Sequence, residues 1–237
     1  MPTRPSLTQR FAIFDRTIAG MNRRLSRVRR KEGMMAALRW SRNELDRTFA
    51  RTPAGVRATV ACRAGCGACC HVPVDVQAHE VFFAAEHMQL NFSDDALTGA
   101  LARLDAHRDR VAAFAEGARD SSRQACPLLS EGSCSIYDGR PQPCHTHHSS
   151  DADVCAEHLA DPSVDLEKVY IPALRARMFA VMLGVDESLE AHVYDERSYD
   201  FGSALHEALT NSLCLPRWLR RQAAFPDSCL SDRFSES

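Results

Sequence analysis

Four of the ten cysteines in this 237-residue chain fall within nine residues, and this density constrains the fold more than any other feature. The segment reads Cys62-Arg-Ala-Gly-Cys66-Gly-Ala-Cys69-Cys70. Four more cysteines follow at Cys126, Cys134, Cys144 and Cys155. Thiols gathered in this way form disulfides, carry out redox chemistry or bind a soft transition metal. Compartment and spacing decide among the three.

The amino terminus carries charged residues early, at Arg4, Arg10, Asp15 and Arg16, and lacks the apolar core and cleavage site of a secretory signal. The apolar stretches of the chain are too short to cross a bilayer. We therefore expect a cytoplasmic protein without a membrane span. Cysteines stay reduced in that compartment, so a disulfide scaffold is disfavoured.

Positive charge is concentrated at the start of the chain. Residues 1–51 carry thirteen Arg or Lys against four acids, although the net charge of the whole chain is only −2. A basic amphipathic arm can contact nucleic acid, an anionic membrane surface or an acidic partner. Because interleaved aromatic residues and Gly-rich phosphate loops are missing from the sequence of this arm, the pattern favours a solvated helical arm and gives no clear nucleic-acid signal.

Helical periodicity of apolar residues recurs along most of the chain. It predicts a helical arm punctuated at Gly33, a helix ending near Asn91, and a second helix that starts with Ser93 as its cap and ends near Gly117. The same apolar periodicity predicts further helices in the carboxy-terminal part of the chain. Breaks are expected in it at Gly184, Gly202 and Pro216.

Between residues 121 and 162 the periodicity gives way to Ser, Gly, Pro, Asp and His punctuated by cysteine. Such a stretch has few core-forming residues, and a bound metal is a natural clamp for it. We therefore predict a mainly α fold in which two irregular cysteine-rich loops converge on a metal site. The expected parts are a basic helical arm (1–55), a cysteine-cluster region (56–160) and a helical region packing on it (161–237).

The short spacings of Cys62, Cys66 and Cys69 suit ligands that must reach one ion. The glycines on both sides of Cys66 let the backbone fold closely and direct amide hydrogens at thiolates. Cys69 and Cys70 are adjacent, and two neighbouring thiolates do not easily ligate the same small ion in a relaxed geometry. One of them is expected to serve a second centre, to support a ligand or to pack.

Prolines restrict the second loop beside Cys126 and Cys144, which lowers the entropy lost when these ligands are fixed. Arg140 can place a permanent cation near several thiolates. Tyr137 can cover the site, although both side chains are equally compatible with ordinary loop anchors.

The order of short motifs identifies a family. Cys-x3-Cys-x2-Cys-Cys is followed by Cys-Pro-Leu-Leu, Gly-x-Cys-x-Ile-Tyr and Arg-Pro-x-x-Cys, and this arrangement resembles the cysteine-cluster family described as zinc- or iron-chelating domains, over about residues 62–155. The resemblance implies a metal held by eight cysteines, and some members have been called iron-sulfur oxidoreductases. The positions that match the motifs are Cys62, Cys66, Cys69, Cys70, Cys126, Cys134 and Cys144. Cys155 is the natural eighth ligand.

One departure from the family concerns the residues after Cys144. Many relatives continue with Arg there, whereas this chain has His145, Thr146, His147 and His148. Imidazole binds zinc, iron, copper and nickel, so a metal site with both Cys and His ligands is compatible with the sequence. His71 is a further candidate ligand for such a site. A His cluster on a polar loop is, however, more often exposed than ligating.

Spacing leaves both zinc and iron-sulfur open, because eight thiols can build two four-ligand zinc sites or hold a cluster through three close cysteines and a remote one. The uneven gaps of the second loop favour an iron-sulfur cluster for at least one centre. Three function classes follow: a metal-binding protein, an iron-sulfur oxidoreductase or protein-modifying enzyme, and a thiol-disulfide protein using Cys69 and Cys70. The first is favoured because no separate substrate motif is visible. Outside the cluster, Cys214 is expected to be buried and Cys229 to be free.

Overall fold

The structure is a computed structural model, and it describes residues 7–63, 65–114, 119 and 122–231. Ten α-helices account for most of these residues, and the strands are only two residues long. The chain is therefore mainly α, as predicted. Its contacts divide it into two compact units, each built from two stretches of sequence. The first unit comprises residues 1–63 and 145–194, and the second comprises 64–144 and 195–237. The predicted division into 1–55, 56–160 and 161–237 stays a prediction.

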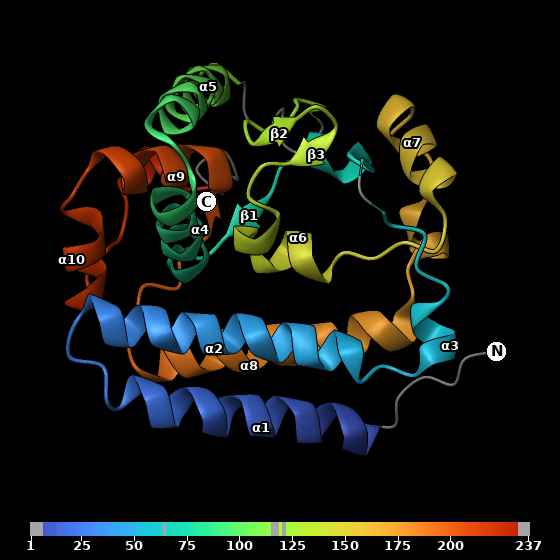
Figure 1. Cartoon of the computed structure of the whole chain (residues 1–237), viewed down its shortest axis with the longest axis horizontal. Helices are drawn as coiled ribbons and strands as arrows, with labels where there is room; N and C mark the ends of the chain where they lie inside the picture. The colour runs from blue at the N-terminus through green and yellow to red at the C-terminus, as the bar shows by residue number, and fades with distance from the viewer. Residues whose placement is uncertain (1–6, 64, 115–118, 120–121, 232–237) are drawn as a thin grey trace. The chain divides into compact units, whose positions relative to one another are not determined.

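Three long helices form the first unit. They are α1 (Leu7–Leu25), α2 (Lys31–Ala50) and α8 (Pro172–Ala191), and they pack side by side (Figure 1). Their apolar faces meet in one core, to which Ile13, Leu45, Leu174, Met178 and Val181 contribute. The shorter elements are α3 (Ala54–Arg57), α7 (Ala152–Ala160) and the 3-10 turn η3 (Leu166–Val169).

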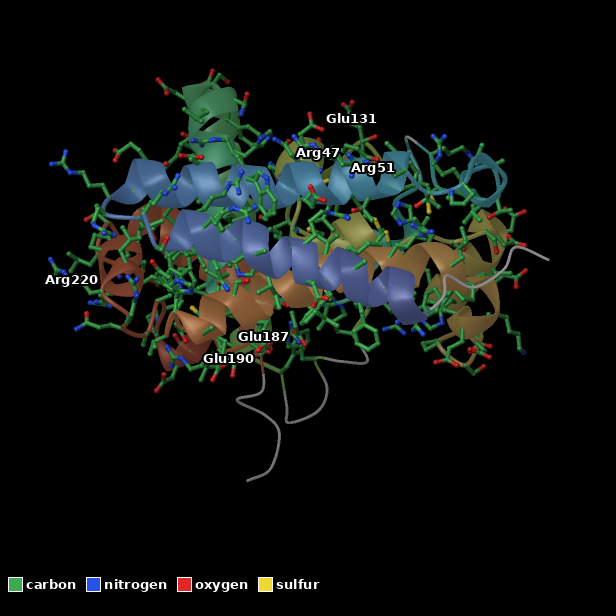
Figure 2. All side chains as sticks on the ribbon, turned by 90° about the horizontal axis from the view of Figure 1, so that it is seen from below. Arg47, Arg51, Glu131, Glu187, Glu190 and Arg220 are labelled. Carbon is green, nitrogen blue, oxygen red and sulfur yellow. The ribbon has the colours of Figure 1, made fainter. Side chains whose placement is uncertain are left out.

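The basic arm is helical, as its periodicity predicted, but it forms two helices. The chain turns over residues 26–30, and Gly33 lies inside α2 and does not interrupt it. Charged side chains lie on the exposed sides of these helices. Figure 2 labels Arg47 and Arg51 at the end of α2, both of which are exposed.

The second unit combines helices with two small antiparallel pairs. Its helices are α4 (Ala78–Asn91), α5 (Asp94–Ala112), α9 (Phe201–Thr210) and α10 (Cys214–Leu219). Strand β1 (Asp75–Val76) pairs with β4 (Tyr199–Asp200), and β2 (Leu129–Ser130) pairs with β3 (Ser133–Cys134). The 3-10 turns are η1 (Ala68–His71), η2 (Tyr137–Gly139) and η4 (Asp227–Cys229). The short helix α6 (Gln142–Thr146) contains the boundary between the units.

Helix α9 is central to the second unit and packs against both α4 and α5. Phe82 contacts the rings of Trp218 and Phe225, and Phe225 also meets Tyr199 edge-on, so an aromatic cluster closes this core. Ser93 caps α5 as predicted, because its hydroxyl accepts a hydrogen bond from the Ala96 amide at 3.3 Å. The expected end of this helix near Gly117 lies outside the described residues.

Of the three predicted breaks in the carboxy-terminal region, the one at Gly184 is wrong, whereas the chain does leave helix at residues 192–200 and 211–213, just before Gly202 and Pro216. Gly184 lies inside α8, Gly202 lies in the first turn of α9, and Pro216 lies in the first turn of α10. Proline is tolerated in a first turn, where its missing amide has no intrahelical acceptor. The two glycines are explained by packing: a Cβ atom on Gly184 would lie 2.9 Å from Thr17 Cβ, and one on Gly202 would lie 2.3 Å from His107 Cδ2.

Candidate metal centre

The first cysteine loop is a tight turn that packs on the β2–β3 hairpin. Cys69 and Cys70 lie in η1, where the Cys70 amide donates to the Gly67 carbonyl at 3.0 Å. A Cβ atom on Gly67 would lie 3.2 Å from Leu129 and 3.3 Å from the Gly132 carbonyl oxygen. Glycine is therefore favoured here, because a Cβ atom would require the hairpin to shift slightly.

A two-residue turn sets the hairpin that carries Cys134. Glu131 and Gly132 have φ angles of 50° and 75°, which is the conformation of a type I′ turn between antiparallel strands. The turn places Cys134 opposite Leu129. Gly132 suits the second turn position because a positive φ carries no steric cost for glycine.

Backbone hydrogen bonds join the two cysteine loops within the second unit. The Cys126 amide donates to the Cys70 carbonyl at 2.7 Å, which brings together residues from two distant parts of the sequence. Leu128 and Ile136 are fully buried on either side of the hairpin. The second loop therefore has apolar anchors of its own, although its sequence predicted little core.

Helix α4 anchors the helix that carries Cys144. The Glu80 carboxylate accepts hydrogen bonds from the Gln142 amide at 2.7 Å and from the Gln77 amide at 2.8 Å. The Gln142 side chain also contacts His79 Nε2 at 2.6 Å. Burial lowers the pKa of His79 to about 3, so its imidazole is neutral. These two α4 side chains were not predicted as part of the site, because nothing in a helical pattern marks a contact made 60 residues away.

Thiols of the second unit influence one another electrostatically. Burial raises the pKa of Cys144 well above its usual range, and the thiols of Cys126, Cys69 and Cys134 raise it further. Burial likewise raises the pKa of Cys126 to about 11. A thiolate at Cys126 or Cys144 is therefore disfavoured until a positive charge lies close by.

The predicted cation lies near one of these thiols. The guanidinium of Arg140 stacks on the Tyr137 ring at 3.8 Å. The pKa of Cys69 is raised by its hydrogen bond with Cys70 and by burial, and the charge of Arg140 opposes this increase. Reactive redox cysteines have a lowered pKa, and the raised pKa of Cys69 departs in the opposite direction.

Cys62 and Cys155 belong to the first unit, whereas the other six cysteines of the predicted ligand set belong to the second. The sulfur of Cys62 accepts a hydrogen bond from the Ser149 amide at 3.3 Å, and the Ala61 amide donates to the Ser149 carbonyl at 2.9 Å. Cys155 lies on α7, and its thiol donates to the Asp151 carbonyl at 3.3 Å.

Residues 61–165 match the model of the CxxCxxCC family, described as a putative zinc- or iron-chelating domain. The predicted family is confirmed over this segment. All eight predicted ligands lie inside the CxxCxxCC segment, and Cys214 and Cys229 lie outside it. No curated protein and no solved structure matches the chain.

The three histidines that distinguish this CxxCxxCC segment each contact residues of the first unit. His145 Nε2 lies 3.1 Å from an Asp46 carboxylate oxygen, His147 meets the Tyr170 ring edge-on, and His148 stacks on Phe49. In the second unit, His71 contacts the Gly67 carbonyl through Nδ1 at 3.1 Å. A carbonyl oxygen only accepts hydrogen bonds, so His71 Nδ1 carries a proton in this contact.

The donor set suits the metals that the CxxCxxCC description names. Among the described residues, no three His, Cys, Asp or Glu side chains are gathered closely enough to hold a metal ion. The six cysteines of the second unit are nevertheless soft donors, which zinc and iron-sulfur clusters prefer. The described helices include none that is both long and apolar enough to cross a membrane. Cys214 and Cys229 are buried, so the prediction for Cys214 is confirmed.

Proposed function

We propose that this protein binds zinc or iron through thiolates of the CxxCxxCC segment. The main ligands come from Cys66, Cys69, Cys70, Cys126, Cys134 and Cys144. The observation that carries the proposal is the match of residues 61–165 to the CxxCxxCC family, together with the hydrogen bond from the Cys126 amide to the Cys70 carbonyl that joins the two cysteine loops. In keeping with it, three further thiols raise the pKa of the Cys144 thiol. Thiolates that repel one another are suited to bind a shared cation, because the cation attracts each of them and stabilises the deprotonated form.

The residues around the thiols would support this role. Glu80 and His79 fix the position of α6, and through it the position of Cys144. Arg140 supplies a permanent positive charge near Cys69, which would offset part of the charge of a Cys69 thiolate. A bound metal would supply the remaining positive charge and hold the thiols in their deprotonated form.

Cys62 and Cys155 complete the proposed ligand set. Their sulfurs contact the backbone at Ser149 and Asp151, both close to residue 145, where the chain re-enters the first unit. We propose zinc or an iron-sulfur cluster as the two forms of the centre, and the uneven gaps between Cys126, Cys134, Cys144 and Cys155 favour the cluster for at least one site.

Analysis of metal and acid-labile sulfide in protein purified without oxygen tests the proposal, together with the visible absorption spectrum. Iron with sulfide and a charge-transfer band identifies a cluster, and colourless protein with stoichiometric zinc identifies a zinc site. Protein that contains neither metal, and that binds neither added Zn²⁺ nor added Fe²⁺, would show that the proposal is wrong.

Serine variants then identify the ligands. Cys126→Ser and Cys144→Ser should weaken metal binding by more than about 100-fold, since loss of a supporting residue alone costs about 10- to 100-fold. Cys214→Ala is the matched control, because Cys214 is a buried cysteine outside the segment, and it should retain the metal. Cys62→Ser and Cys155→Ser decide whether the two cysteines of the first unit also ligate.

A further inference from the structure

One face of α8 is exposed, although this helix packs against both other long helices of the first unit. The residues of this face recur every three or four positions, so they form a single stripe along the helix, which we call the α8 stripe. In chain order they are Arg175, Phe179, Leu183, Glu187 and Glu190, of which Phe179 is partly buried and the other four are exposed. Figure 2 shows Glu187 and Glu190 on the side of α8 that is turned away from α2.

The middle of the α8 stripe is apolar. Leu183 is 53% exposed, and on the neighbouring helix α1 the Phe11 side chain is 61% exposed. Phe11 lies one turn before Phe14, whose carbonyl oxygen would lie 3.1 Å from a Cβ atom on Gly184, the residue after Leu183. The two exposed apolar side chains therefore belong to adjoining parts of two packed helices. The exposed residues of α2 are instead charged, polar or small.

The two ends of the α8 stripe carry opposite charges. Arg175 lies in the first turn of α8, whereas Glu187 and Glu190 lie near its end. Within the described part of the chain none of the three makes an ion pair. The guanidinium of Arg175 stacks on the rings of Tyr170 and Phe179, at 4.1 and 5.1 Å. This placement is the reverse of what the dipole of a single helix favours, which is negative charge at the amino end and positive charge at the carboxyl end.

A second α8 stripe placed antiparallel to the first is complementary to it along its whole length. The midpoint between Arg175 and Glu190 falls beside Leu183, so a two-fold axis there brings Arg175 of each copy level with Glu190 of the other. The same axis places the two Leu183 side chains against each other, with Phe179 of each copy beside them. Each charge then lies at the end of the other helix whose dipole attracts it. A closed two-fold dimer requires a surface that is self-complementary in this way.

We propose that the protein forms a two-fold symmetric dimer through the α8 stripes of two copies, with Phe11 at the edge of the contact. Each α8 is about 30 Å long, so two such helices with α1 beside them give a contact near the lower end of specific interfaces. The dissociation constant should accordingly be on the order of 10 µM. The dimer does not depend on the metal centre, because no cysteine of the proposed ligand set lies on α1 or α8.

Sedimentation equilibrium of the full chain, as purified, at concentrations up to about 100 µM tests the proposal. We expect an equilibrium between monomer and dimer that shifts towards the monomer as salt is added, because exposed ion pairs are screened. A chain that stays monomeric at every concentration would overturn the proposal. So would a dimer that disappears when a reducing agent is added, since such a dimer is linked by cysteine.

Charge reversal tests the predicted pairing of the two ends. Arg175→Glu places a negative charge opposite Glu190 of the second copy, and Glu190→Arg places a positive charge opposite Arg175, so each should weaken dimerisation at least about 10-fold. The double variant restores opposite charges and should return the dissociation constant to within about 3-fold of the original value. Arg51→Glu, at an exposed arginine that follows α2 in the same unit, is the matched control and should leave dimerisation unchanged.

Leu183→Ser tests the apolar middle of the contact. It should weaken dimerisation at least about 10-fold, because the two-fold axis removes one apolar side chain from each copy. Leu213→Ser is the matched control, since Leu213 is 56% exposed in the second unit, and it should have no effect. If Arg175→Glu does not fold, Glu190→Arg and Leu183→Ser still decide the outcome. A dimer that neither of these two variants weakens would use another surface and would overturn the proposal.

Discussion

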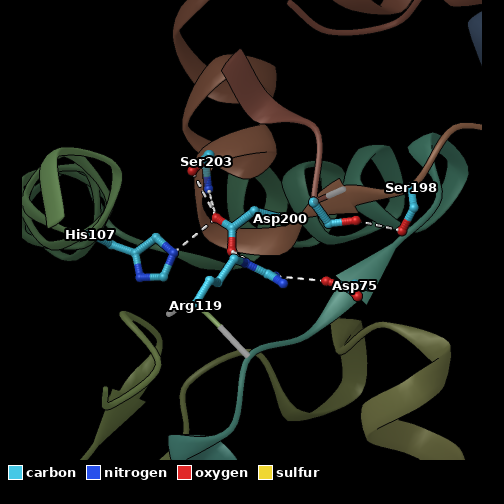
Figure 3. A network of polar contacts seen from close by, with 7 residues as sticks. Asp75, His107, Arg119, Ser198, Asp200 and Ser203 are labelled. Carbon is cyan, nitrogen blue, oxygen red and sulfur yellow. Dashed lines mark hydrogen bonds and ion pairs between the residues drawn. The ribbon is translucent and has the colours of Figure 1, made fainter. Parts of the chain in front are cut away.

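Two carboxylates of this chain show how the surroundings of an acid decide its effect on stability. Asp200 is buried, but five hydrogen-bond or ion-pair donors surround it (Figure 3) and its pKa stays below the usual range. Asp186, on α8, is partly buried, and its removal from water raises its pKa to about 7. The first ionised carboxylate is therefore stabilised by the fold, and the second is destabilised by it.

We predict that Asp186→Asn stabilises the protein at pH 8 and leaves its stability nearly unchanged at pH 4. The pKa of Asp186 is higher in the folded chain than in the unfolded chain, so the folded state loses stability as the pH rises from about 4 to about 7. The amide cannot ionise, and the gain at pH 8 should be on the order of 2–4 kcal/mol. Urea unfolding at both pH values measures it.

Glu187→Gln is the control for this change. Glu187 is the next residue on α8 and is exposed, as Figure 2 shows, so its replacement should alter stability little at either pH. A gain for Asp186→Asn that is the same at pH 4 and pH 8 would mean that ionisation of Asp186 is not its cause.

The helices could be predicted from the sequence wherever apolar spacing and capping agree, as they do for α4 and α5. The predicted break at Gly184 failed for a definite physical reason. A glycine in a helical pattern signals either a flexible backbone or a close approach by another element, and the sequence alone does not distinguish them. Gly184 belongs to the second kind, because Thr17 and the Phe14 carbonyl of α1 approach it closely.

Gly184→Ala should therefore destabilise the first unit by about 1–3 kcal/mol, the range for overpacking of a filled contact. The added methyl group would lie 2.9 Å from Thr17 Cβ and 3.1 Å from the Phe14 carbonyl oxygen, so α1 and α8 would have to move apart. The midpoint of urea unfolding checks this expectation.

Gly33→Ala is the matched control with the opposite sign. Gly33 also lies in a helix of the first unit, but its nearest neighbour, Val28 Cα, would be 3.6 Å from the new atom. Alanine should stabilise α2 by about 0.5–1 kcal/mol through its higher helix propensity. If Gly184→Ala stabilised the protein as much as Gly33→Ala does, close packing would not be the reason for Gly184.

The cysteine motifs predict a set of eight ligands, but they do not predict how the chain distributes these residues between the two units. The CxxCxxCC segment begins and ends in the first unit and passes through the second between residues 64 and 144. Spacing along the sequence carries no information about such a division, because it depends on which helices complete each core. The supporting contact between Glu80 and Gln142 was not predicted for the same reason, because these two residues are 62 positions apart in the sequence.

Removal of the metal should loosen one part of the molecule much more than the rest. The first unit has an apolar core between α1, α2 and α8 that contains no member of the proposed ligand set. The cysteine loops depend instead on a few backbone hydrogen bonds and on Leu128 and Ile136. A structural zinc contributes about 10–16 kcal/mol of binding free energy, so its loss should act mainly on these loops.

Hydrogen exchange of the full chain with and without a chelator measures this difference. We expect faster exchange over residues 66–71 and 126–144 once the metal is removed, and unchanged exchange in α1 and α8. The chelator should cause no further change in Cys144→Ser, because this variant should already lack the metal. An equal increase in α8 and in the loops would mean that the metal stabilises the whole chain, and no increase anywhere would mean that the loops are held without it.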